Sequence, residues 1–346
     1  MLMRYDYLVF IGRFEPYHNG HHAVVRHALT LARKVIVLVG SARKPRTTTN
    51  PWNANEREVM IRAALGGDAD RVLLRALPDH LYNEAAWIGG VQREVAAAIA
   101  DDGGASDATV GLTGFDKDAS SYYLREFPQW ELAAVQYSAV LSATEIREHL
   151  FSADEGGQLL IRANVPTPVA AMLEAFRRTP AFAQLSREFT FLKNYRKAWE
   201  AAPYPPTFVT VDAIVVHSGH VLVVRRGAEP GKGLWALPGG FVGQTETLLD
   251  ACLRELREET RLKLPAPVLK GSLKAQRVFD HPQRSQRGRT ITHAFHFEFA
   301  SGELPPVRGA DDADKARWIP LAQALDLEDQ FYDDHYHILQ FFLGVA

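Results

Sequence analysis

The sequence predicts an α/β protein in which two different domains follow one another. Three observations support this prediction. Short apolar runs such as "YLVFIG" and "KVIVLVG" alternate with amphipathic segments over the first half, a pattern typical of a parallel sheet covered by helices. A charged helical segment at 181–202 then ends at "PYPP". After it, "FVTVDAIVV" and "VLVVRR" indicate a β-hairpin, and no internal repeat relates the two halves.

The first half is expected to form a Rossmann-like layer structure, which binds ligands at the carboxyl ends of its strands. Its expected elements are a strand at 7–12, a helix at 23–31, a strand at 34–40, a helix at 55–65, a strand at 72–76, a helix at 85–100, a strand at 109–113 and a helix from Thr144. We predict domains at 1–180 and 207–346, joined by a linker helix at 181–206.

Size and charge narrow the classes of function. The 346 residues are enough for two cores of ordinary size, and a net charge of -2 gives no field that would attract nucleic acid or an anionic membrane. No run approaches the ~20 apolar residues of a membrane helix, and the first apolar run is too short for a secretory signal. The single cysteine, Cys252, suits a reducing compartment. We expect a cytoplasmic protein with no nucleic-acid or membrane partner, and a homo-oligomer remains open.

The segment "FIGRFEPYHNGHH" places phosphate-binding chemistry directly after the first strand. His18 and His21 lie three positions apart at the start of the next helix, where unpaired N–H groups and the helix dipole attract anions. Gly12 lets the backbone approach a ligand closely, and Arg13 adds a positive charge. A structural role is the ordinary explanation for one histidine, but two at this spacing beside an arginine favour phosphate handling.

Two motifs in the first half resemble those of nucleotidyltransferases that transfer AMP or CMP from a triphosphate. "GRFEPYHNGH" resembles the G-x-F-x-P-x-H-x-G-H signature, and "LSATEIR" resembles the later S-x-T-x-x-R segment. The resemblance implies that Gly12 and Phe14 belong to the substrate site. Ser142 and Thr144 are then expected to cap a helix and meet phosphate oxygens, while Arg147 adds a bidentate cation.

Other segments resemble the archaeal type of nicotinamide-mononucleotide (NMN) adenylyltransferase. They are "NPWNANER" and "LYNEAAW". In that family a tryptophan matching Trp87 stacks on the nicotinamide ring, which suits a cationic pyridinium, and nearby polar groups, with Asn83 as our candidate, recognise its amide. The alternative for Trp87 is a core anchor, and Trp52 is balanced between core and site. Lys117 and Asp118 are assigned no role.

The resemblance implies an in-line attack of the 5′-phosphate of NMN on the α-phosphate of ATP. The products would be NAD and pyrophosphate, without a covalent intermediate. Such a transfer needs positioning and neutralisation of charge, which the histidines, the arginines and Mg²⁺ on the triphosphate would supply. The competing acceptors are phosphopantetheine and flavin mononucleotide.

The second half contains "GGFVGQTETLLDACLRELREETRL", in which three carboxylates share one face of a predicted helix. Glu255, Glu258 and Glu259 lie at positions i, i+3 and i+4, and their mutual repulsion is relieved by a hard divalent cation. The segment resembles the Nudix box, whose family forms an α/β/α sandwich and hydrolyses nucleoside diphosphates linked to another group. The resemblance implies that the three glutamates bind metal and that Arg254 orients Glu255.

One position departs from the Nudix pattern. The family usually has glycine where this chain has Arg261, at the end of the predicted catalytic helix. If that residue adopts a left-handed backbone, arginine costs roughly 1–2 kcal/mol. The change removes no ligand, so we interpret Arg261 as a tolerated variation.

Basic residues gather after this helix, in "SLKAQRVFDHPQRSQRGRTITHAF". We expect a substrate loop in which Arg277 neutralises phosphate and Phe279 stacks a base, and a merely solvated loop is the alternative. A general base is expected from the acidic segment "RGADDADKARW". Asp311, Asp312 and Asp314 are equal candidates for it.

The two signatures, in this order, resemble the bifunctional bacterial NMN adenylyltransferase/Nudix hydrolases. The resemblance implies a Rossmann-like nucleotidyltransferase domain with a parallel sheet, followed by a Nudix α/β/α sandwich domain. It also implies that the second domain cleaves ADP-ribose to AMP and ribose 5-phosphate with Mg²⁺, or with Mn²⁺. The alternative is an adenylyltransferase whose Nudix domain only senses nucleotides, and we expect two independent sites rather than a channel.

Overall fold

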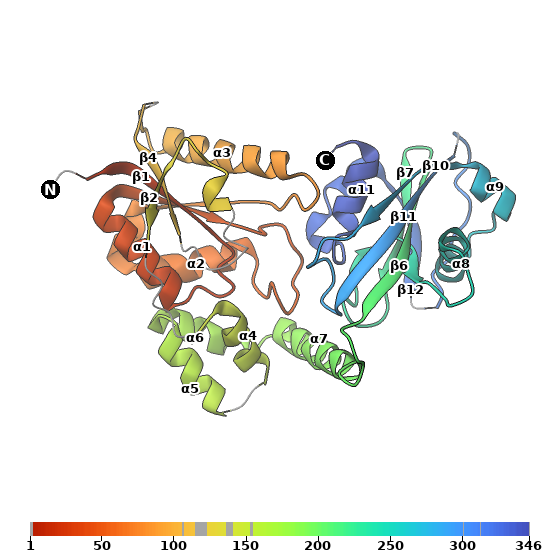
Figure 1. Cartoon of the computed structure of the whole chain (residues 1–346), viewed down its shortest axis with the longest axis horizontal. Coiled ribbons are helices and arrows are strands. Elements are labelled where there is room, and N and C mark those ends of the chain that lie inside the picture. Colours follow the sequence, from red (N-terminus) through yellow and green to blue (C-terminus); the bar gives the residue numbers. More distant parts are fainter. Residues whose placement is uncertain are drawn as a thin grey trace. The chain divides into compact units, whose positions relative to one another are not determined.

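The structure is a computed structural model of the chain (Figure 1). It describes residues 3–105, 107–114, 123–135, 141–152, 155–299, 301–311 and 313–345. The chain divides into two compact units: unit 1 consists of Met1–Asp79 and Glu84–Ser186, and unit 2 of His80–Asn83 and Arg187–Ala346. Three residues considered above, Lys117, Asp118 and Asp312, lie outside the described residues.

Unit 1 is built, in its described part, on a five-stranded sheet whose paired strands are all parallel. The strands are β1 (Tyr5–Gly12), β2 (Ala32–Val39), β3 (Val72–Ala76), β4 (Val110–Gly114) and β5 (Glu131–Ala134). Their order is β3-β2-β1-β4-β5. The chain therefore runs outward from β1 on one side and from β4 on the other, and this reversal puts a ligand site at the carboxyl ends of β1 and β4. The predicted parallel sheet is confirmed.

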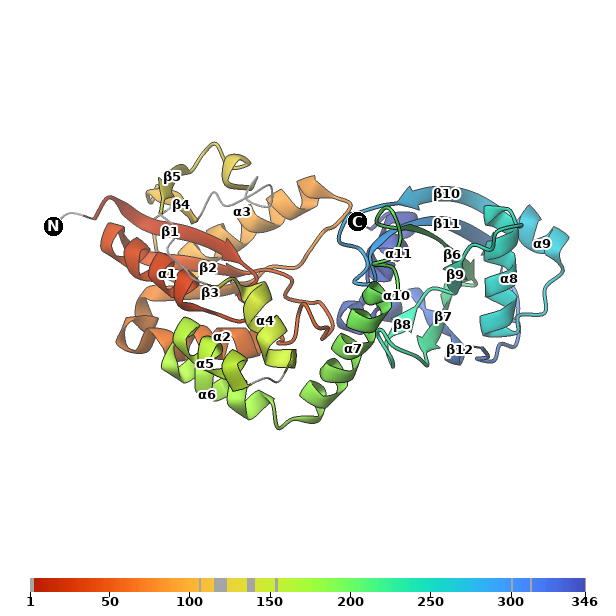
Figure 2. The same cartoon turned by 60° about the horizontal axis from the view of Figure 1, so that its bottom comes forward.

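Helices cover both faces of this sheet. The helices described in unit 1 before α7 are α1 (Asn19–Leu31), α2 (Ala54–Leu65), α3 (Glu84–Asp101), α4 (Ala143–Ser152), α5 (Glu155–Asn164) and α6 (Thr167–Phe176), with a 3₁₀ turn at Gly66–Arg71. Val91, Val95 and Ala98 of α3 are buried against one face of the sheet, and α1 lies on the other face (Figure 2). The β-branched run of β2 is buried from Val35 to Val39, as a strand covered on both faces must be.

Helix α7 (Pro180–Lys197) forms where the sequence indicates a charged helix. The division between the two units falls within α7, after Ser186. None of the described helices is both long and apolar enough to cross a membrane.

Unit 2 contains a mixed sheet between helices. Its strands are β6 (Thr207–His217), β7 (His220–Arg226), β8 (Trp235–Ala236), β9 (Gly239–Phe241), β10 (Leu273–Phe279), β11 (Arg289–Phe299) and β12 (Ala313–Pro320). The order along the sheet is β10-β11-β6-β7-β12, with β8 on β7 and β9 on β6. Only the β11–β6 pairing is parallel among the described strand pairs of this sheet. The predicted hairpin of β6 and β7 is confirmed.

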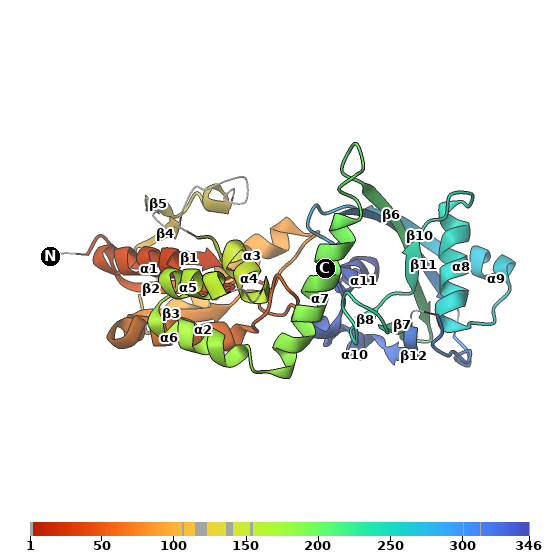
Figure 3. The ribbon, with the colours of Figure 1, turned by 90° about the horizontal axis from the view of Figure 1, so that it is seen from below.

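Two helices enclose this sheet from opposite sides, as Figure 3 shows. Helix α8 (Leu248–Thr260) buries Cys252, Leu253 and Leu256 against one face, and α11 (His335–Leu343) buries Ile338 and Leu339 against the other. The remaining short elements are α9 (Ala266–Gly271), α10 (Leu321–Leu325) and a 3₁₀ turn at Glu328–Gln330. The predicted α/β/α sandwich is confirmed.

The basic segment after α8 is not the loop that we expected. Residues 273–279 and 289–299 are the antiparallel strands β10 and β11, so only the nine residues between them connect. The alternation of "THAFHFEF" is the signal for strand structure that the charge pattern obscured.

Candidate active sites

The two predicted histidines form the N-terminal cap of α1. His18 is the capping residue, and its Nδ1 accepts a hydrogen bond from the backbone N–H of Gly20 at 3.0 Å. The Nδ1 of His21 accepts from the backbone N–H of His18 at 3.4 Å, and the two ring centroids are 3.8 Å apart. The side chain of His18 is 4% exposed and that of His21 is half-buried. Because Nδ1 serves the cap in both rings, any contact to a phosphate has to come from Nε2.

The side chain of Phe14, which was predicted to belong to the substrate site, faces the protein interior. The side chain is 1% exposed and packs against Phe10 and His21, at centroid distances of 5.4 and 4.9 Å. Its ring lies directly beneath Gly12, where an added Cβ would come within 2.8 Å of Phe14 Cζ. The glycine is therefore required by this internal contact, and the expectation of Phe14 as a substrate contact is corrected.

The loop after β1 is held from below by a buried ion pair that sequence reasoning missed. Glu15 and Arg57 are 1% and 0% exposed and lie 3.1 Å apart. Arg57 also donates to the carbonyl oxygens of Arg13 at 2.7 Å and Gly40 at 2.6 Å. Burial raises the pKa of Glu15 to about 8, and Arg57 and the Trp52 N–H oppose this effect. Nothing in "NANEREVM" marks Arg57 as buried, because an arginine on a helix is ordinarily exposed.

The two nucleotidyltransferase motifs meet at Arg147. Its Nη1 donates to the carbonyl oxygen of Glu15 at 2.6 Å, and its Nη2 donates to Thr144 Oγ1 at 3.1 Å. Ser142 begins α4 in the predicted way, since its Oγ accepts from the Glu145 N–H at 3.3 Å. Burial, followed by the charge of the exposed Arg13, lowers the pKa of Arg147 to about 10.

The aromatic residues considered for the NMN site take different positions. Trp87 is half-buried and packs on the core of unit 1 with the rings of Tyr123 and Phe127, at centroid distances of 6.4 and 6.1 Å. Trp52 is 1% exposed and packs against Phe176, so it belongs to the core. Asn83 lies in the short segment that groups with unit 2, where its N–H donates to the carbonyl of His80 at 3.1 Å.

Arg254 is the centre of the acidic cluster in unit 2. Its guanidinium donates to both oxygens of Glu246, at 3.0 and 2.7 Å, to Glu255 at 2.8 Å and to Glu258 at 2.9 Å. It also reaches the carbonyl of Phe241 at 3.2 Å. These hydrogen bonds, with Glu246 first, raise the pKa of Arg254. The structure therefore places Arg254 in contact with Glu255, the residue that the Nudix resemblance implies it orients.

Glu259 lies deeper than the other glutamates of the cluster. It is 8% exposed, and its Oε2 accepts from the backbone N–H of Gly239 at 3.0 Å. Burial raises its pKa to about 8, and burial also raises the pKa of Glu255. The carboxylate of Glu255 lies close to Gly240, since an added Cβ there would come within 2.5 Å of Glu255 Oε1.

The donor chemistry of this cluster fits a divalent cation. The described residues contain no group of three acidic, histidine or cysteine side chains already arranged to hold a metal ion. Carboxylate oxygens are the ligands that hard cations prefer. The raised pKa values of Glu255 and Glu259 indicate two buried carboxylates that a positive ion would stabilise in their charged form.

The segment after α8 brings one candidate base to the cluster. Arg261 ends the helix with φ 53° and ψ 24°, which confirms the left-handed backbone considered above. The charge of Asp311 is near enough to Glu255 to raise its pKa, whereas Asp314 is an exposed residue of β12. Among the described candidates, Asp311 is therefore the one placed close to the glutamates.

The prediction that Phe279 stacks a base is wrong. Its side chain has no exposed surface and packs among the rings of Tyr82, Phe341 and Phe342, at centroid distances of 4.9, 5.6 and 5.9 Å. It points inward because it continues the core-facing side of the sheet under α11. Arg277 is exposed, but its guanidinium lies 3.9 Å from the ring centroid of Phe341, so both residues contribute to the packing beneath α11.

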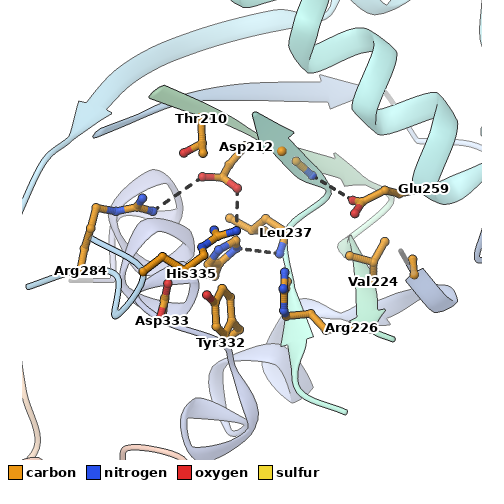
Figure 4. A pocket seen from close by; sticks show the side chains of 15 residues that line it. Thr210, Asp212, Val224, Arg226, Leu237, Glu259, Arg284, Tyr332, Asp333 and His335 are labelled. Carbon is orange, nitrogen blue, oxygen red and sulfur yellow. Dashed lines mark hydrogen bonds and ion pairs between the residues drawn. The ribbon is translucent and has the colours of Figure 1, made fainter. Parts of the chain in front are cut away.

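A polar pocket next to Glu259 was not predicted (Figure 4). It holds about 500 Å³ of space that protein atoms do not fill, counting its opening to solvent. Its polar lining consists of Thr210, Asp212, Arg226, Glu259, Arg284, Arg287, Tyr332, Asp333 and His335. These residues come from β6, β7, α8, the β10–β11 connection and the start of α11, so no single stretch of sequence signals the pocket.

A network of buried hydrogen bonds and ion pairs stabilises one wall of the pocket. Arg284 makes two hydrogen bonds to Asp334, at 2.9 and 2.8 Å, and lies 3.9 Å from Asp212. The Nδ1 of His335 accepts from the backbone N–H of Leu237 at 3.0 Å and lies 3.8 Å from Asp212. Asp212 also accepts from Thr292 Oγ1 at 2.6 Å. This network fixes the wall in place.

A parallel sheet with capping histidines at its switch point, joined to a sandwich carrying a glutamate-rich helix, defines a two-domain nucleotide enzyme: a nucleotidyltransferase fused to a Nudix hydrolase. Family models agree, since residues 9–149 match the cytidylyltransferase-like model and residues 206–342 match the NUDIX domain. The chain belongs to the family of bifunctional NMN adenylyltransferases/ADP-ribose pyrophosphatases.

Similar proteins support this assignment. A solved bifunctional NMN adenylyltransferase/ADP ribose pyrophosphatase from Francisella tularensis, complexed with AMP and a manganese ion, is 34% identical, with a TM-score of 0.91 over 98% of this chain and 99% of that one. A nicotinamide/nicotinic acid mononucleotide adenylyltransferase from Acinetobacter baylyi is 35% identical over 54% of this chain and 95% of its own length. An ADP-ribose pyrophosphatase from Methanocaldococcus jannaschii is 37% identical over 38% of this chain and 68% of its own length.

Proposed function

We propose that unit 1 transfers the adenylyl group of ATP to nicotinamide mononucleotide, giving NAD and pyrophosphate. The observation that carries this proposal is the hydrogen bond from Arg147 to the Glu15 carbonyl, because it joins the start of α4 to the histidine-capped loop. The triphosphate of ATP would lie between these two segments, at the positive end of α1. The hydroxyls of Ser142 and Thr144 border the same place.

The chemistry asks for position and positive charge rather than for a nucleophile on the protein. The 5′-phosphate of NMN attacks the α-phosphate in line while pyrophosphate leaves. His18 and His21 donate to the phosphate oxygens through Nε2, and Arg13 and Arg147 neutralise the charge that spreads over them. Mg²⁺ accompanies the triphosphate as part of the substrate, with Mn²⁺ as a substitute.

The acceptor would be recognised at the start of α3. The exposed part of Trp87 offers an aromatic face to the cationic nicotinamide ring. Asn83, immediately before α3, is the candidate for contacting its amide. Both proposed contacts are to the nicotinamide ring and its amide, so they favour NMN over phosphopantetheine and flavin mononucleotide as the acceptor.

Product analysis tests the proposal for unit 1. The protein is incubated with ATP and NMN, and NAD and pyrophosphate are measured. His18→Asn keeps a side chain that caps helices well, so we expect α1 to remain folded while NAD formation falls at least 100-fold. His18→Ala should lose the same activity and, in addition, about 1 kcal/mol of stability. Full activity in His18→Asn would show that the imidazole serves only as a cap.

We propose that unit 2 hydrolyses ADP-ribose to AMP and ribose 5-phosphate. The observation that carries this proposal is the position of Arg254, which holds Glu255 and Glu258 beside the buried Glu259. The three glutamates would hold a divalent ion, Mg²⁺ or Mn²⁺. When bound, such an ion polarises the diphosphate and lowers the pKa of a water molecule.

The residues of the chain then have separate tasks. Arg254 keeps the carboxylates of Glu255 and Glu258 oriented, and the Gly239 N–H orients Glu259. Asp311 is our preferred general base, because its charge reaches Glu255, and Asp312 and Asp314 remain the alternatives.

AMP release from ADP-ribose in the presence of Mg²⁺ tests the proposal for unit 2. Glu258→Gln should abolish AMP release and leave NAD formation unchanged, whereas Glu303→Gln, which neutralises an exposed carboxylate outside the Nudix box, should change neither. The sensor alternative requires binding of ADP-ribose without AMP release. The intact set of box glutamates, of which Glu255, Glu258 and Glu259 lie on α8, disfavours it.

We also propose that the enzyme works in the cytoplasm. The proposal is supported by the buried thiol of Cys252, which suits a reducing compartment. Fractionation of cells that express the tagged protein would test it.

A further inference from the structure

The pocket beside Glu259 contains polar atoms that the fold itself does not satisfy. The hydroxyl of Tyr332 and the Nε of Arg287 are buried and have no hydrogen-bond partner among the described residues. Tyr332 is only 4% exposed, and its hydroxyl is directed toward Asp333 without a hydrogen bond of normal geometry (Figure 4). Buried polar groups are paired in most proteins. An unpaired hydroxyl that lines a pocket therefore points to a ligand that pairs with it.

The pocket offers hydrogen bonds rather than flat apolar faces. The ring of Tyr332 is covered by the guanidinium of Arg226, 4.2 Å from its centroid. Gly231 also lies against this ring, because an added Cβ would come within 2.2 Å of Tyr332 Cδ2. What Tyr332 presents to the pocket is thus its hydroxyl, next to the carboxylate of Asp333 and the guanidiniums of Arg226 and Arg287. Sugar hydroxyls suit this mixture because each can donate and accept.

A better surface for a base lies just outside the pocket. Phe241 is 40% exposed, and its ring is 5.9 Å from that of Phe208, which packs in turn against Trp199 at 5.3 Å. Arg287 joins the two places, since it lines the pocket and lies 4.9 Å from the ring centroid of Phe241. An adenine ring gains more by stacking on an exposed aromatic face than by entering a polar pocket.

We propose, on the basis of the function proposed for unit 2, that this pocket binds the terminal ribose of ADP-ribose. The hydroxyl of Tyr332 and the carboxylate of Asp333 pair with the ribose hydroxyls, and Arg226 borders the adjoining phosphate. Gly239 and Glu259 line the same pocket, so the ribose lies one phosphate away from the glutamate cluster. Tyr332 and Asp333 therefore determine the specificity of the hydrolase for a diphosphate that ends in a free sugar.

Titration calorimetry with the two products, ribose 5-phosphate and AMP, tests this proposal without metal and without turnover. Tyr332→Phe removes only the hydroxyl. We expect it to raise the dissociation constant for ribose 5-phosphate about fivefold, which is the effect of one neutral hydrogen bond. The dissociation constant for AMP should change less than twofold. The melting temperature of this variant should stay equal or rise, because an unpaired buried hydroxyl is lost. A purely structural role would lower the melting temperature instead.

Two further variants keep the test independent of folding problems. Asp333→Asn should again weaken the binding of ribose 5-phosphate selectively. Phe241→Leu should instead weaken only the binding of AMP. The inference is overturned if Tyr332→Phe weakens the binding of AMP as much as that of ribose 5-phosphate, or if it changes the affinity for neither. Failure of the proposed function has a different signature, since the wild-type protein would then release no AMP from ADP-ribose in Mg²⁺ even though the selective effect of Tyr332→Phe persists.

Discussion

Arg147 donates a hydrogen bond from Nη1 to the backbone carbonyl of Glu15 at 2.6 Å, although 132 positions of sequence separate the two residues. The acceptor lies in the loop between β1 and the capping histidines, and Arg147 lies on α4. The second nitrogen of the same guanidinium holds Thr144 at 3.1 Å. One buried side chain thus fixes both phosphate-binding segments of unit 1 to each other.

Replacing Arg147 by lysine tests this connection. A single ammonium group cannot reproduce the planar fork that holds Glu15 and Thr144 together. We expect the unfolding free energy of unit 1 to fall by about 1–2 kcal/mol and NAD formation to fall more than tenfold. Denaturant unfolding and steady-state kinetics measure the two effects. Arg62→Lys, at an exposed ion pair on α2, should be neutral, and equal behaviour of the two variants would contradict the expectation.

Trp87→Ala distinguishes a nicotinamide contact from a core anchor. If the exposed part of the indole faces the pyridinium, KM for NMN should rise about tenfold while KM for ATP changes less than twofold. Trp52→Phe serves as the control, because Trp52 is fully buried and its replacement should lower stability without changing the ratio of the two KM values. A parallel rise of both KM values in Trp87→Ala would place Trp87 in the core alone.

The raised pKa of Glu259 predicts a pH dependence of stability in metal-free protein. Its folded-state pKa is about 8, above the ordinary value of 4.5, so the folded state binds more protons than the unfolded state between these values. Stability is therefore highest below about pH 4.5 as far as this group is concerned, falls as the pH rises, and levels off above about 8. Glu259→Gln should remove this decline and be more stable than wild type at pH 8.

Divalent metal supplies the control for this experiment. Because a bound cation favours the charged carboxylate, Mg²⁺ or Mn²⁺ should raise the melting temperature of wild type at pH 8 much more than that of Glu259→Gln. A decline of the same size in both proteins, measured by thermal unfolding across the pH range, would assign the pH dependence to other groups.

Arg261→Gly should stabilise unit 2. Arg261 has φ 53°, a region in which a non-glycine residue is strained by roughly 1–2 kcal/mol, and the residue is not a proposed ligand. We expect the unfolding transition of unit 2 to gain about 1 kcal/mol, partly offset by the greater freedom of glycine in the unfolded chain. ADP-ribose hydrolysis should be unchanged. Arg261→Ala keeps the Cβ and should gain nothing, so an equal gain in both variants would rule out backbone strain as the cause.

Local patterns in the sequence were sufficient for much of the fold. The parallel strands, the hairpin of β6 and β7 and the cap at Ser142 all follow from neighbouring residues. The meeting of the two nucleotidyltransferase motifs was also predictable, because the carboxyl ends of parallel strands share one edge of the sheet.

The errors arose where a local pattern had two possible surroundings. Phe14 and Phe279 are aromatic residues beside basic ones, which suits both a ligand contact and a core, and their full burial places them in the core. Arg57 resembles a surface residue in its own helix, yet it lies under the loop and pairs with Glu15. Periodicity says which face of an element is apolar, but it does not say how deeply a charged residue is covered.

The sequence by itself determined which chemistry this protein carries: imidazoles at a helix start in one half and carboxylates on a helix face in the other. Only the tertiary structure decided what surrounds that chemistry, including the Arg147–Glu15 bridge and the polar pocket around Tyr332. The physical reason is the range of the interactions. Helix caps and carboxylate spacing depend on residues three or four positions apart, whereas a pocket depends on packing that brings distant segments together and excludes water from between them.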